Sequence, residues 1–453
     1  MMDARVEPGH DEKEIRGLAK TPLRNWQDTI AVGWLVKPAG NWQEPGKDAI
    51  PSGAFPVKPA DPATSVHPAR MILILALAPA VGLGIGRFAY SLVLPDMRDA
   101  LGWSYSTAGF MNTVNAIGYL AGALGAASFV RRFGLYRSVM IGALACLLSL
   151  AICALSANLL IFSFARLLAG LGAAVIVVGG GTLAATIAQS RPEKSAFLIS
   201  LFYTGPGAGL IISGLVSPFL LQWFGTGSWW IVWIALAAIC VPMIIPFLLN
   251  PIDTPTAAAS DASVAVPLKP VAPYLAGYFL FGAGYIAYMT FLIAYARDAG
   301  GDAATQSLIW CMIGLAGCAA PWLWRGLTAR STGSGGITAM LIAVSTIGTV
   351  IALIGTSTPM LALSAFVFGS AFFSVTTATT AFARLNYPPA AWPKAIGIFT
   401  IMFSLGQALG PFATGAITDA TGSLTYALYL SAAAMVLGGV LCALQRPLAR
   451  SSV

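Results

Sequence analysis

The chain has 453 residues, of which 57% are hydrophobic and 9% are charged, whereas about 25% of the residues of a soluble globular domain carry a charge. Residues 1–70 hold nine of the 17 acidic and nine of the 25 basic residues, so the rest of the chain is almost uncharged. This composition excludes a water-soluble globular protein and indicates a protein embedded in a lipid bilayer.

Residues 1–69 are rich in Pro, Gly and charged residues, without helical or strand periodicity. We expect a disordered cytoplasmic tail. Its start, Met1 to Lys20, lacks the apolar core of about 7–15 residues found in a secretory signal peptide. Because the first apolar segment begins at Met71, that residue is an alternative start of the chain.

Twelve apolar segments follow, each long enough to cross a hydrocarbon core of about 30 Å as a helix. Their many Gly and Pro residues are tolerated in membrane helices, because neighbouring helices satisfy the backbone. We therefore predict an all-α membrane protein. Its helices are expected at residues 71–95, 105–129, 135–156, 158–188, 195–222, 228–249, 272–296, 304–324, 335–356, 359–384, 394–418 and 424–445.

The charge of the loops predicts the orientation of these helices. Alternate loops and the C-terminal tail carry 12 basic residues, whereas the opposite loops carry two, Arg98 and Arg297. Positive charge is concentrated in cytoplasmic loops. We expect both termini in the cytoplasm and the protein in the cell membrane, which is the inner membrane if the source is a Gram-negative bacterium.

An internal repeat relates the two halves of the apolar region. Segment 84–90, GIGRFAY, is echoed by segment 282–288, GAGYIAY, at an offset of 198 residues. A second set of glycines repeats at an offset of 201 residues, pairing Gly205, Gly209 and Gly214 with Gly406, Gly410 and Gly415. A repeat of six helices returns the chain to the same side of the membrane, so the halves are parallel copies.

The repeat predicts two six-helix bundles, over residues 70–250 and 272–446, which can rock about a central site and expose it to each side in turn. Residues 251–271, rich in Ala, Ser and Pro, form the predicted cytoplasmic linker, and residues 447–453 a cytoplasmic tail.

Motifs of other protein classes are absent from the sequence. No G-x-x-x-x-G-K-[ST] segment indicates ATP-driven transport. Both histidines precede the apolar region, and no Cys/His cluster has metal-ligand spacing. We expect no cofactor, no metal, no nucleic-acid partner and no enzymatic activity.

Three motifs resemble those of the major facilitator superfamily (MFS), over essentially all of residues 71–445. Segment 160–174, LIFSFARLLAGLGAA, looks like that family's helix 4 motif, and GPGAG at 205–209 partly resembles its antiporter motif. The loop after the second helix resembles the family's cytoplasmic loop motif, although an arginine replaces its acidic residue; the matching residues are Arg131, Arg132, Gly134 and Arg137.

The segment 84–90, with MNT at 111–113 and GYL at 118–120, looks like the YbfB/YjiJ-type bacterial group of this superfamily. The resemblance implies two pseudo-symmetric bundles and alternating access of a small-molecule substrate. It names no substrate, and we expect a monomer in the bilayer.

Arg87 and Arg166 are the main candidates for substrate binding, because an arginine inside a membrane helix costs about 2.5–3.5 kcal/mol. They are expected at similar depth, where they could jointly hold an anionic group by charge-assisted hydrogen bonds. Alternatively, Arg166 pairs with backbone carbonyls and Arg87 extends toward the membrane surface.

The second half lacks both charges. Tyr285 aligns with Arg87, and Phe366 lies 200 residues after Arg166. We therefore expect a site that is basic on one wall and aromatic on the other, which suits a carboxylate with an apolar body. Further candidates for substrate contact or coupling are Tyr90, Asn112, Asn115, Tyr285 and Tyr288, although interhelical hydrogen bonds would also explain the asparagines.

Small residues in the fifth and eleventh helices permit close helix contact, and their prolines can bend the helices. We expect hinge or packing roles for Gly205, Pro206, Gly209, Gly406, Gly410 and Pro411.

The mode of coupling stays open, because no Asp, Glu or His occurs inside a predicted span; Asp96 and Asp419 lie near outer ends. Either Asp96 carries a proton, or a substrate carboxylate does, or transport is uncoupled. The leading hypothesis is a carrier of a small organic anion. The alternatives are a proton-coupled efflux antiporter of drugs or metabolites, and a membrane sensor that signals through residues 1–69.

Overall fold

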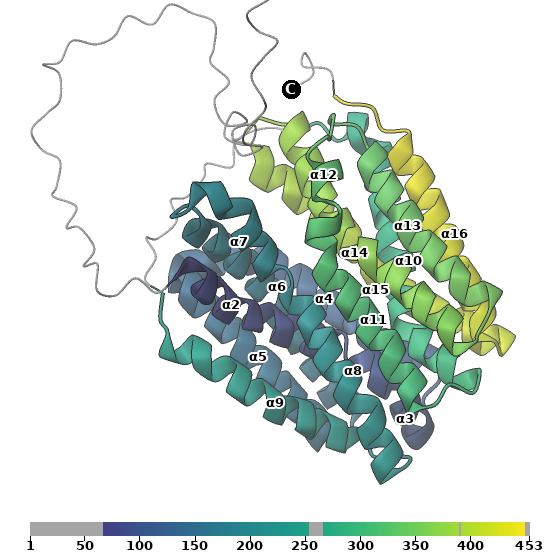
Figure 1. The fold of residues 1–453 in the computed structure, drawn as a ribbon. Coiled ribbons are helices and arrows are strands. Elements are labelled where there is room, and N and C mark those ends of the chain that lie inside the picture. The colour runs from purple at the N-terminus through teal and green to yellow at the C-terminus, as the bar shows by residue number, and fades with distance from the viewer. Residues whose placement is uncertain (1–66, 253–265, 389–390, 449–453) are drawn as a thin grey trace, which may run out of the picture. The chain divides into compact units, whose positions relative to one another are not determined.

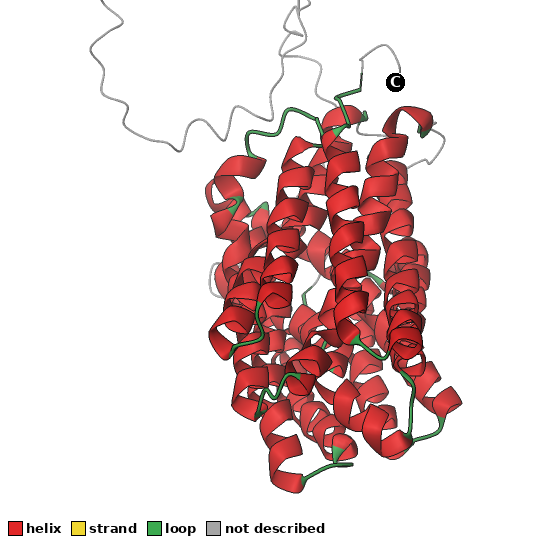
Figure 2. Cartoon of the chain, turned by 90° about the vertical axis from the view of Figure 1, so that its right-hand side faces the viewer, coloured by secondary structure: helices red, strands yellow, loops and turns green. Residues whose placement is uncertain are grey.

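The computed structural model describes residues 67–252, 266–388 and 391–448. Within these ranges the regular secondary structure is helical (Figures 1 and 2). Nearly all of the predicted N-terminal tail and most of the predicted linker and C-terminal tail lie outside the described residues.

Twelve spans of the described residues are long and apolar enough to cross a membrane, which confirms the twelve predicted helices. The first span consists of α2 (Pro68–Pro79), η3 (Ala80–Arg87) and α3 (Tyr90–Leu101). The fifth consists of η4 (Pro192–Lys194), α7 (Ser195–Phe202) and α8 (Gly205–Phe224). The other spans of the first half are α4 (Tyr105–Phe133), α5 (Leu135–Leu155), α6 (Leu159–Ala188) and α9 (Trp229–Leu249).

In the second half, the short η5 (Lys269–Val271) leads into the seventh span, and α12 (Arg325–Thr328) follows the eighth. The six spans of this half are built on α10 (Ala272–Asp298), α11 (Ala303–Leu323), α13 (Gly336–Ile354), α14 (Thr358–Asn386), α15 (Trp392–Thr421) and α16 (Leu424–Ala443).

Several helices run further than hydropathy predicts, because glycines rather than polar residues end them. α3 continues to Leu101 and stops at Gly102, whose φ of 64° is left-handed. α15 continues to Thr421 and stops at Gly422, with φ of 70°. The expectation that acidic residues lie outside the helices is therefore wrong for four of them: Asp96 lies within α3, and Asp99, Asp298 and Asp419 occupy last turns.

The two ends of the helical unit carry different turns. The proximal end is the one at which the described chain begins, at His67, and ends, at Leu448; α7 and α12 lie there (Figure 1). The distal end is the opposite one, where residues 102–104 join α3 to α4. The basic loop residues that the structure describes lie at the proximal end, apart from Arg98 and Arg297 at the distal one, so the predicted orientation places the proximal end in the cytoplasm.

Helices of the two halves meet most extensively where α4 packs against α15 and α8 packs against α11, and α3 also packs against α10. Glycines allow the closest approach: Gly109 of α4 faces the Pro411 carbonyl, and Gly207 of α8 faces Gly314 of α11. Within the halves, α8 packs against η3 and α15 against α10, which is the same relation in both copies of the repeat. The domain limits themselves stay a prediction.

Candidate functional site

The first span changes its geometry midway along its length. It winds as the π-helix η3 and then passes through a turn at residues 88–89. The Phe88 amide donates to the Leu83 carbonyl at 3.1 Å, and the Ser91 amide donates to the Phe88 carbonyl at 3.1 Å. In a regular α-helix Ser91 would instead donate to the carbonyl of Arg87. A carbonyl freed inside a membrane protein needs another donor.

Arg166 of α6 supplies that donor. Its Nη1 donates to the Gly86 carbonyl at 2.9 Å, and its Nη2 donates to the Arg87 carbonyl at 3.0 Å. Nη2 also donates to Oδ1 of Asn112 at 2.9 Å, while the guanidinium lies 4.7 Å from the centre of the Tyr90 ring. This geometry agrees with the alternative in which Arg166 pairs with backbone carbonyls. Substrate binding by Arg166 stays a prediction.

The neighbouring polar candidates also have partners within the protein. Asn112 Nδ2 donates to Oγ1 of Thr290 at 2.7 Å, and Asn115 Nδ2 donates to the Arg166 carbonyl at 2.9 Å. Both asparagines thus make the interhelical hydrogen bonds considered from the sequence. The buried Tyr90 donates its hydroxyl to a backbone carbonyl of α4. Substrate contact by these three residues stays a prediction.

Arg87 is directed across the boundary between the halves. Its Nη2 donates to Oε1 of Gln407, on α15, at 2.8 Å. Gln407 Nε2 in turn donates to the hydroxyl oxygen of Tyr285, on α10. The Arg87 guanidinium also lies 4.6 Å from the centre of the half-buried Tyr119 ring of α4. The structure therefore brings the aligned residues Arg87 and Tyr285 together through a glutamine.

Arg87 has no acidic partner in the described part of the chain. Arg87 is 3% exposed, and neither of the two ion pairs among the described residues includes it. Its Nε also lacks a hydrogen-bond partner among the described residues. A buried charge is costly unless it is paired and hydrogen-bonded. Arg87 therefore presents a positive charge and a free donor that an anion can satisfy.

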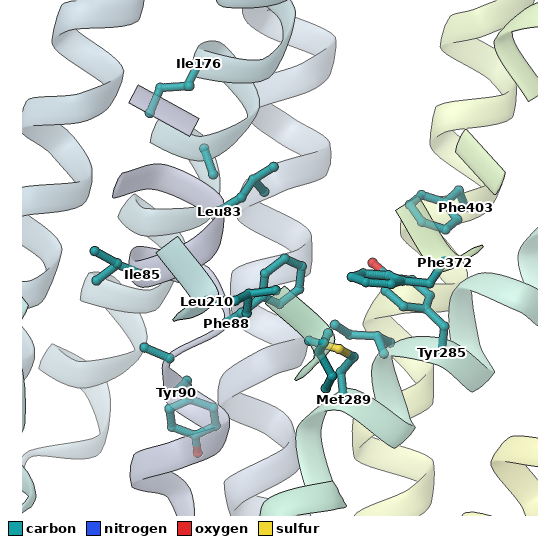
Figure 3. Close-up of a cluster of buried hydrophobic side chains, with 14 of the residues drawn as sticks. Leu83, Ile85, Phe88, Tyr90, Ile176, Leu210, Tyr285, Met289, Phe372 and Phe403 are labelled. Atoms are coloured by element: carbon teal, nitrogen blue, oxygen red, sulfur yellow. The ribbon is translucent and has the colours of Figure 1, made fainter. Parts of the chain in front are cut away.

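Aromatic rings of the second half surround Tyr285 (Figure 3). The Tyr285 ring lies 5.4 Å from that of Phe403 and nearly parallel to it, 5.2 Å from Phe281 and 5.9 Å from Phe372. Tyr285 therefore lies among aromatic rings, and a substrate site with a basic and an aromatic wall stays a prediction. The expectation for Phe366 is wrong, because it is 42% exposed on the surface of α14, whereas Phe372, on the same helix, is buried.

Tyr288, another candidate, lies fully buried within the second half and shares a hydrogen bond with Ser364 of α14. Sequence reasoning missed Gln407. It follows Gly406, which the repeat marked, but a single glutamine gives no signal that its partner is an arginine 320 residues away.

The glycines predicted as hinges lie at close helix contacts in both halves. A side chain on Gly205 or Gly209 would collide with backbone carbonyls of the first span. One on Gly406 or Gly410 would collide with carbonyls of α10. These positions therefore require glycine for packing, and bending at Pro206 and Pro411 stays a prediction.

The basic loop motif lies at the proximal end. Gly134 has φ of 79° and separates α4 from α5, so it makes the turn possible. Arg131, Arg132 and Arg137 are exposed, and Arg131 donates to Ser128 Oγ at 2.8 Å. A role of this loop in gating stays a prediction.

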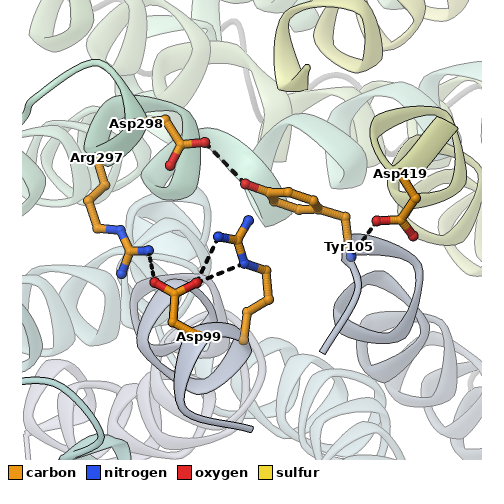
Figure 4. Close-up of polar contacts among 6 residues, drawn as sticks. Asp99, Tyr105, Arg297, Asp298 and Asp419 are labelled. Carbon is orange, nitrogen blue, oxygen red and sulfur yellow. Dashed lines mark hydrogen bonds and ion pairs between the residues drawn. The ribbon is translucent and has the colours of Figure 1, made fainter. Parts of the chain in front are cut away.

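At the distal end, polar side chains join the halves (Figure 4). Asp99 of α3 pairs with its neighbour Arg98 at 2.7 Å and with Arg297 of α10. Asp419 of α15 accepts hydrogen bonds from the amides of Tyr105 and Ser106 at 2.8 Å each, at the start of α4. The sequence showed that Arg98 and Arg297 occupy equivalent positions in the two halves. It did not show that Arg297 pairs with Asp99 of the other half.

Asp96, the acidic residue considered for coupling, is 5% exposed. Its carboxylate accepts hydrogen bonds from the amides of Gly227 at 2.9 Å and Trp229 at 3.0 Å, at the start of α9. Asp96 therefore caps a helix of its own half, away from Arg87.

Solved structures with a similar fold include membrane transporters. The chain is similar to the nucleoside transporter NupG, with a TM-score of 0.65 and 14% identity over 82% of this chain and 98% of that chain. It is also similar to the E. coli fucose:proton symporter FucP, with a TM-score of 0.55 and 16% identity over 84% and 99%. Twelve spans and these neighbours show that the chain has the fold of these membrane transporters.

The family model described as "Uncharacterised MFS-type transporter YbfB" matches residues 79–443. The chain belongs to this family. Part of it also resembles Multidrug resistance protein 2 of Bacillus subtilis (strain 168), with 30% identity over 156 residues. That match covers 33% of this chain and 39% of the relative, so the chain spans well under half of that protein.

Proposed function

We propose that this transporter moves a small organic anion by alternating access, and that the anionic group binds at Arg87. The observation that carries the proposal is the buried guanidinium of Arg87, which has no acidic partner among the described residues and makes one hydrogen bond there, whereas that of Arg166 makes three. A charge in this position is retained at a cost in stability, which an anionic ligand would offset.

The surroundings of Arg87 favour an anion with an apolar or aromatic body. Gln407 separates Arg87 from Tyr285, whose ring packs with those of Phe403 and Phe372. The ring of Tyr119 lies against the Arg87 guanidinium itself. Flat rings in parallel orientation offer faces against which a planar apolar group can pack. We therefore propose that a substrate carboxylate faces Arg87 and that its body packs toward Tyr285.

Arg166 acts in this proposal as a positioning residue. Its hydrogen bonds to the Gly86 and Arg87 carbonyls fix the backbone from which the Arg87 side chain extends. Asn112 holds the same guanidinium through Oδ1, so it supports the position of Arg87 indirectly.

A thermal-shift screen of the purified protein tests the proposal, because a ligand at 100 times its Kd stabilises the folded state by about 2.7 kcal/mol. Benzoate, benzamide and benzamidinium form a matched set of anion, neutral compound and cation, to be screened beside aliphatic organic acids. We expect stabilisation by anions only, and its loss in Arg87→Gln. Stabilisation that the neutral compound shares, or that Arg87→Gln retains, would contradict an anion site at Arg87.

A second candidate function is efflux of apolar drugs in exchange for protons. It is supported by the partial similarity to the Bacillus multidrug protein and by the aromatic residues around Tyr285. Under this proposal a deletion strain becomes sensitive to lipophilic cations, and a gene encoding Arg87→Gln restores resistance. The anion proposal predicts no such sensitivity.

Coupling and location are further parts of the proposal. FucP is described as a proton symporter, and in the present chain a proton could be carried by Asp96 or by the substrate carboxylate. We propose a cell-membrane protein with its proximal end in the cytoplasm. A signalling role for residues 1–69 would be tested by deleting them and measuring flux and growth.

A further inference from the structure

The hydrogen bond between Arg87 and Gln407 joins the two halves of the transporter at the middle of the molecule. Arg87 lies in η3 of the first half, and Gln407 lies in α15 of the second. Both residues are buried, with 3% and 1% exposure. The bond is therefore shielded from water. A hydrogen bond to a charged group is stronger in such a buried environment than in water.

The chemistry of the two groups fixes the orientation of the Gln407 amide. A guanidinium has donors only, so the atom facing Arg87 must be the amide oxygen. The amide nitrogen then points at Tyr285, whose hydroxyl oxygen accepts its hydrogen bond. Tyr285 keeps its own hydroxyl proton to donate elsewhere.

We propose that Gln407 is an internal, neutral substitute for the anionic group of the substrate. Its amide oxygen occupies Arg87 as a carboxylate oxygen would, and an entering anion displaces it. Displacement is favourable because a carboxylate accepts stronger hydrogen bonds from a guanidinium than an amide does, and can accept two at once. Arg87 Nε and the Tyr285 hydroxyl are the donors available to the second oxygen.

Displacement of Gln407 breaks a bond between the halves. The bond exists in the conformation whose distal ends are joined by Asp99, Arg297 and Asp419. Substrate entry at Arg87 therefore weakens that conformation and favours one in which the distal ends separate. In this way Gln407 links occupancy of the site to the rocking of the bundles. The displacement step rests on the anion proposal above, whereas the bond between the halves does not.

Hydrogen–deuterium exchange of the distal turns, residues 101–106 and 298–303, measures the opening of that end. Gln407→Leu keeps the size of the side chain but removes the bond to Arg87. We expect roughly tenfold faster exchange of both turns, the effect of losing one hydrogen bond to a charged group. Gln407→Glu supplies a carboxylate to Arg87 and should slow the exchange. Gln189→Leu, on the exposed proximal end of α6, is the control and should change neither turn.

Adding benzoate tests the displacement. It should accelerate exchange in the natural protein, and it should have no effect on Gln407→Glu, in which Arg87 is already paired. If Gln407→Leu proves unstable, Tyr285→Phe is the second variant, because it removes only the acceptor of the Gln407 amide nitrogen. We expect its distal turns to exchange faster than those of the natural protein, by less than tenfold.

Three results have distinct meanings. Unchanged exchange in both Gln407 variants would overturn the inference, because the bond would then not hold the halves. Faster exchange in Gln407→Leu with no response of the natural protein to benzoate or to the aliphatic acids would support the bond between the halves and overturn the displacement step. The thermal-shift screen then distinguishes the two causes: stabilisation by the anions keeps the anion proposal, and its absence contradicts that proposal as well. A response to benzoate that Gln407→Glu retains would overturn the displacement step.

Discussion

Two buried arginines lie beside one another and have different surroundings. Arg166 places its donors on the Gly86 and Arg87 carbonyls and on Asn112. Among the described residues Arg87 makes one side-chain hydrogen bond, to Gln407, and the Nε of both arginines lacks a partner. The number of acceptors therefore distinguishes them, and we infer that Arg166 supports the backbone of the site whereas Arg87 binds the ligand.

Arg166→Lys tests whether the site needs the planar guanidinium of Arg166, which donates to several acceptors at once. An ammonium group cannot span three acceptors that a guanidinium reaches from one plane, so at least one buried carbonyl loses its donor. We expect a loss of about 1–3 kcal/mol in the free energy of unfolding, measured by denaturant or thermal unfolding in detergent. Arg131→Lys, at an exposed site, should be within about 0.5 kcal/mol of the natural protein. Equal stability of Arg166→Lys would contradict the assigned role.

The limits of sequence reasoning at this scale follow from distance along the chain. Membrane burial alone marks Arg87 and Arg166 as candidates, since charge is rare in the spans. Their partners could not be found in the same way. Gln407 is a neutral residue in the other half, and the carbonyls of Gly86 and Arg87 become acceptors only because η3 departs from α-helical geometry.

At the scale of the helices, the repeated glycines determine how closely the fifth and eleventh spans approach the first and seventh. Gly84 lies directly against Gly209 in the first half, and Gly406 lies against α10 in the second. The position of Arg87 depends on this packing, because α8 covers the π-helix from which the side chain extends.

Gly406→Ala should disturb this packing, since the new methyl group would collide with the Phe279 carbonyl oxygen. We expect a loss of about 1–3 kcal/mol in stability together with lower flux. Gly397→Ala is a control in the same helix, where a methyl group meets nothing within 4 Å. It should be neutral or slightly stabilising, since alanine restricts the unfolded chain. Similar stability of the two variants, measured by thermal unfolding, would contradict the packing role.

Hydropathy predicted the number and order of the spans because each one is a long apolar segment. It set the end of the first span too early, since the polar residues from Asp96 onward lie inside the last turns of α3. The break at residues 88–89 was also invisible, because Gly82, Gly84 and Gly86 are compatible with either helical geometry.

At the scale of the molecule, the distal contacts and the bond between Arg87 and Gln407 both join the halves. Asp419 caps α4 across the boundary, whereas Asp302 caps α11 within the second half by accepting the Thr305 amide at 2.8 Å. That amide also holds the pKa of the Asp302 carboxyl below its usual value. Both aspartates cap a helix, but Asp419 joins the two halves and Asp302 holds only the start of α11.

Asp419→Ala should therefore open the distal end, whereas Asp302→Ala should loosen only the start of α11. Cysteines placed at the two halves' distal turns, at Ala157 and Thr356, would report the opening through spin-label distances in a background without the six native cysteines. We expect the distance between the two labels to be longer in Asp419→Ala than in the background protein, and unchanged in Asp302→Ala. Equal distances in both variants would show that Asp419 does not hold the halves together.

The sequence repeat predicted two related halves, and the family match and fold agree with a transporter built in this way. It could not predict the contacts between the halves, because those depend on how the bundles are tilted. Arg98 and Arg297 occupy equivalent positions, yet both pair with the same carboxylate, that of Asp99.

The most direct test of an anion carrier is flux into liposomes that contain the purified protein. Organic anions that stabilise the protein, together with their neutral amides, would be followed for the natural protein, Arg87→Lys and Arg87→Gln. We predict flux of the anion but not of its amide, weaker flux in Arg87→Lys, and flux at the level of empty liposomes in Arg87→Gln. Anion flux that is unchanged in Arg87→Gln would contradict the central claim.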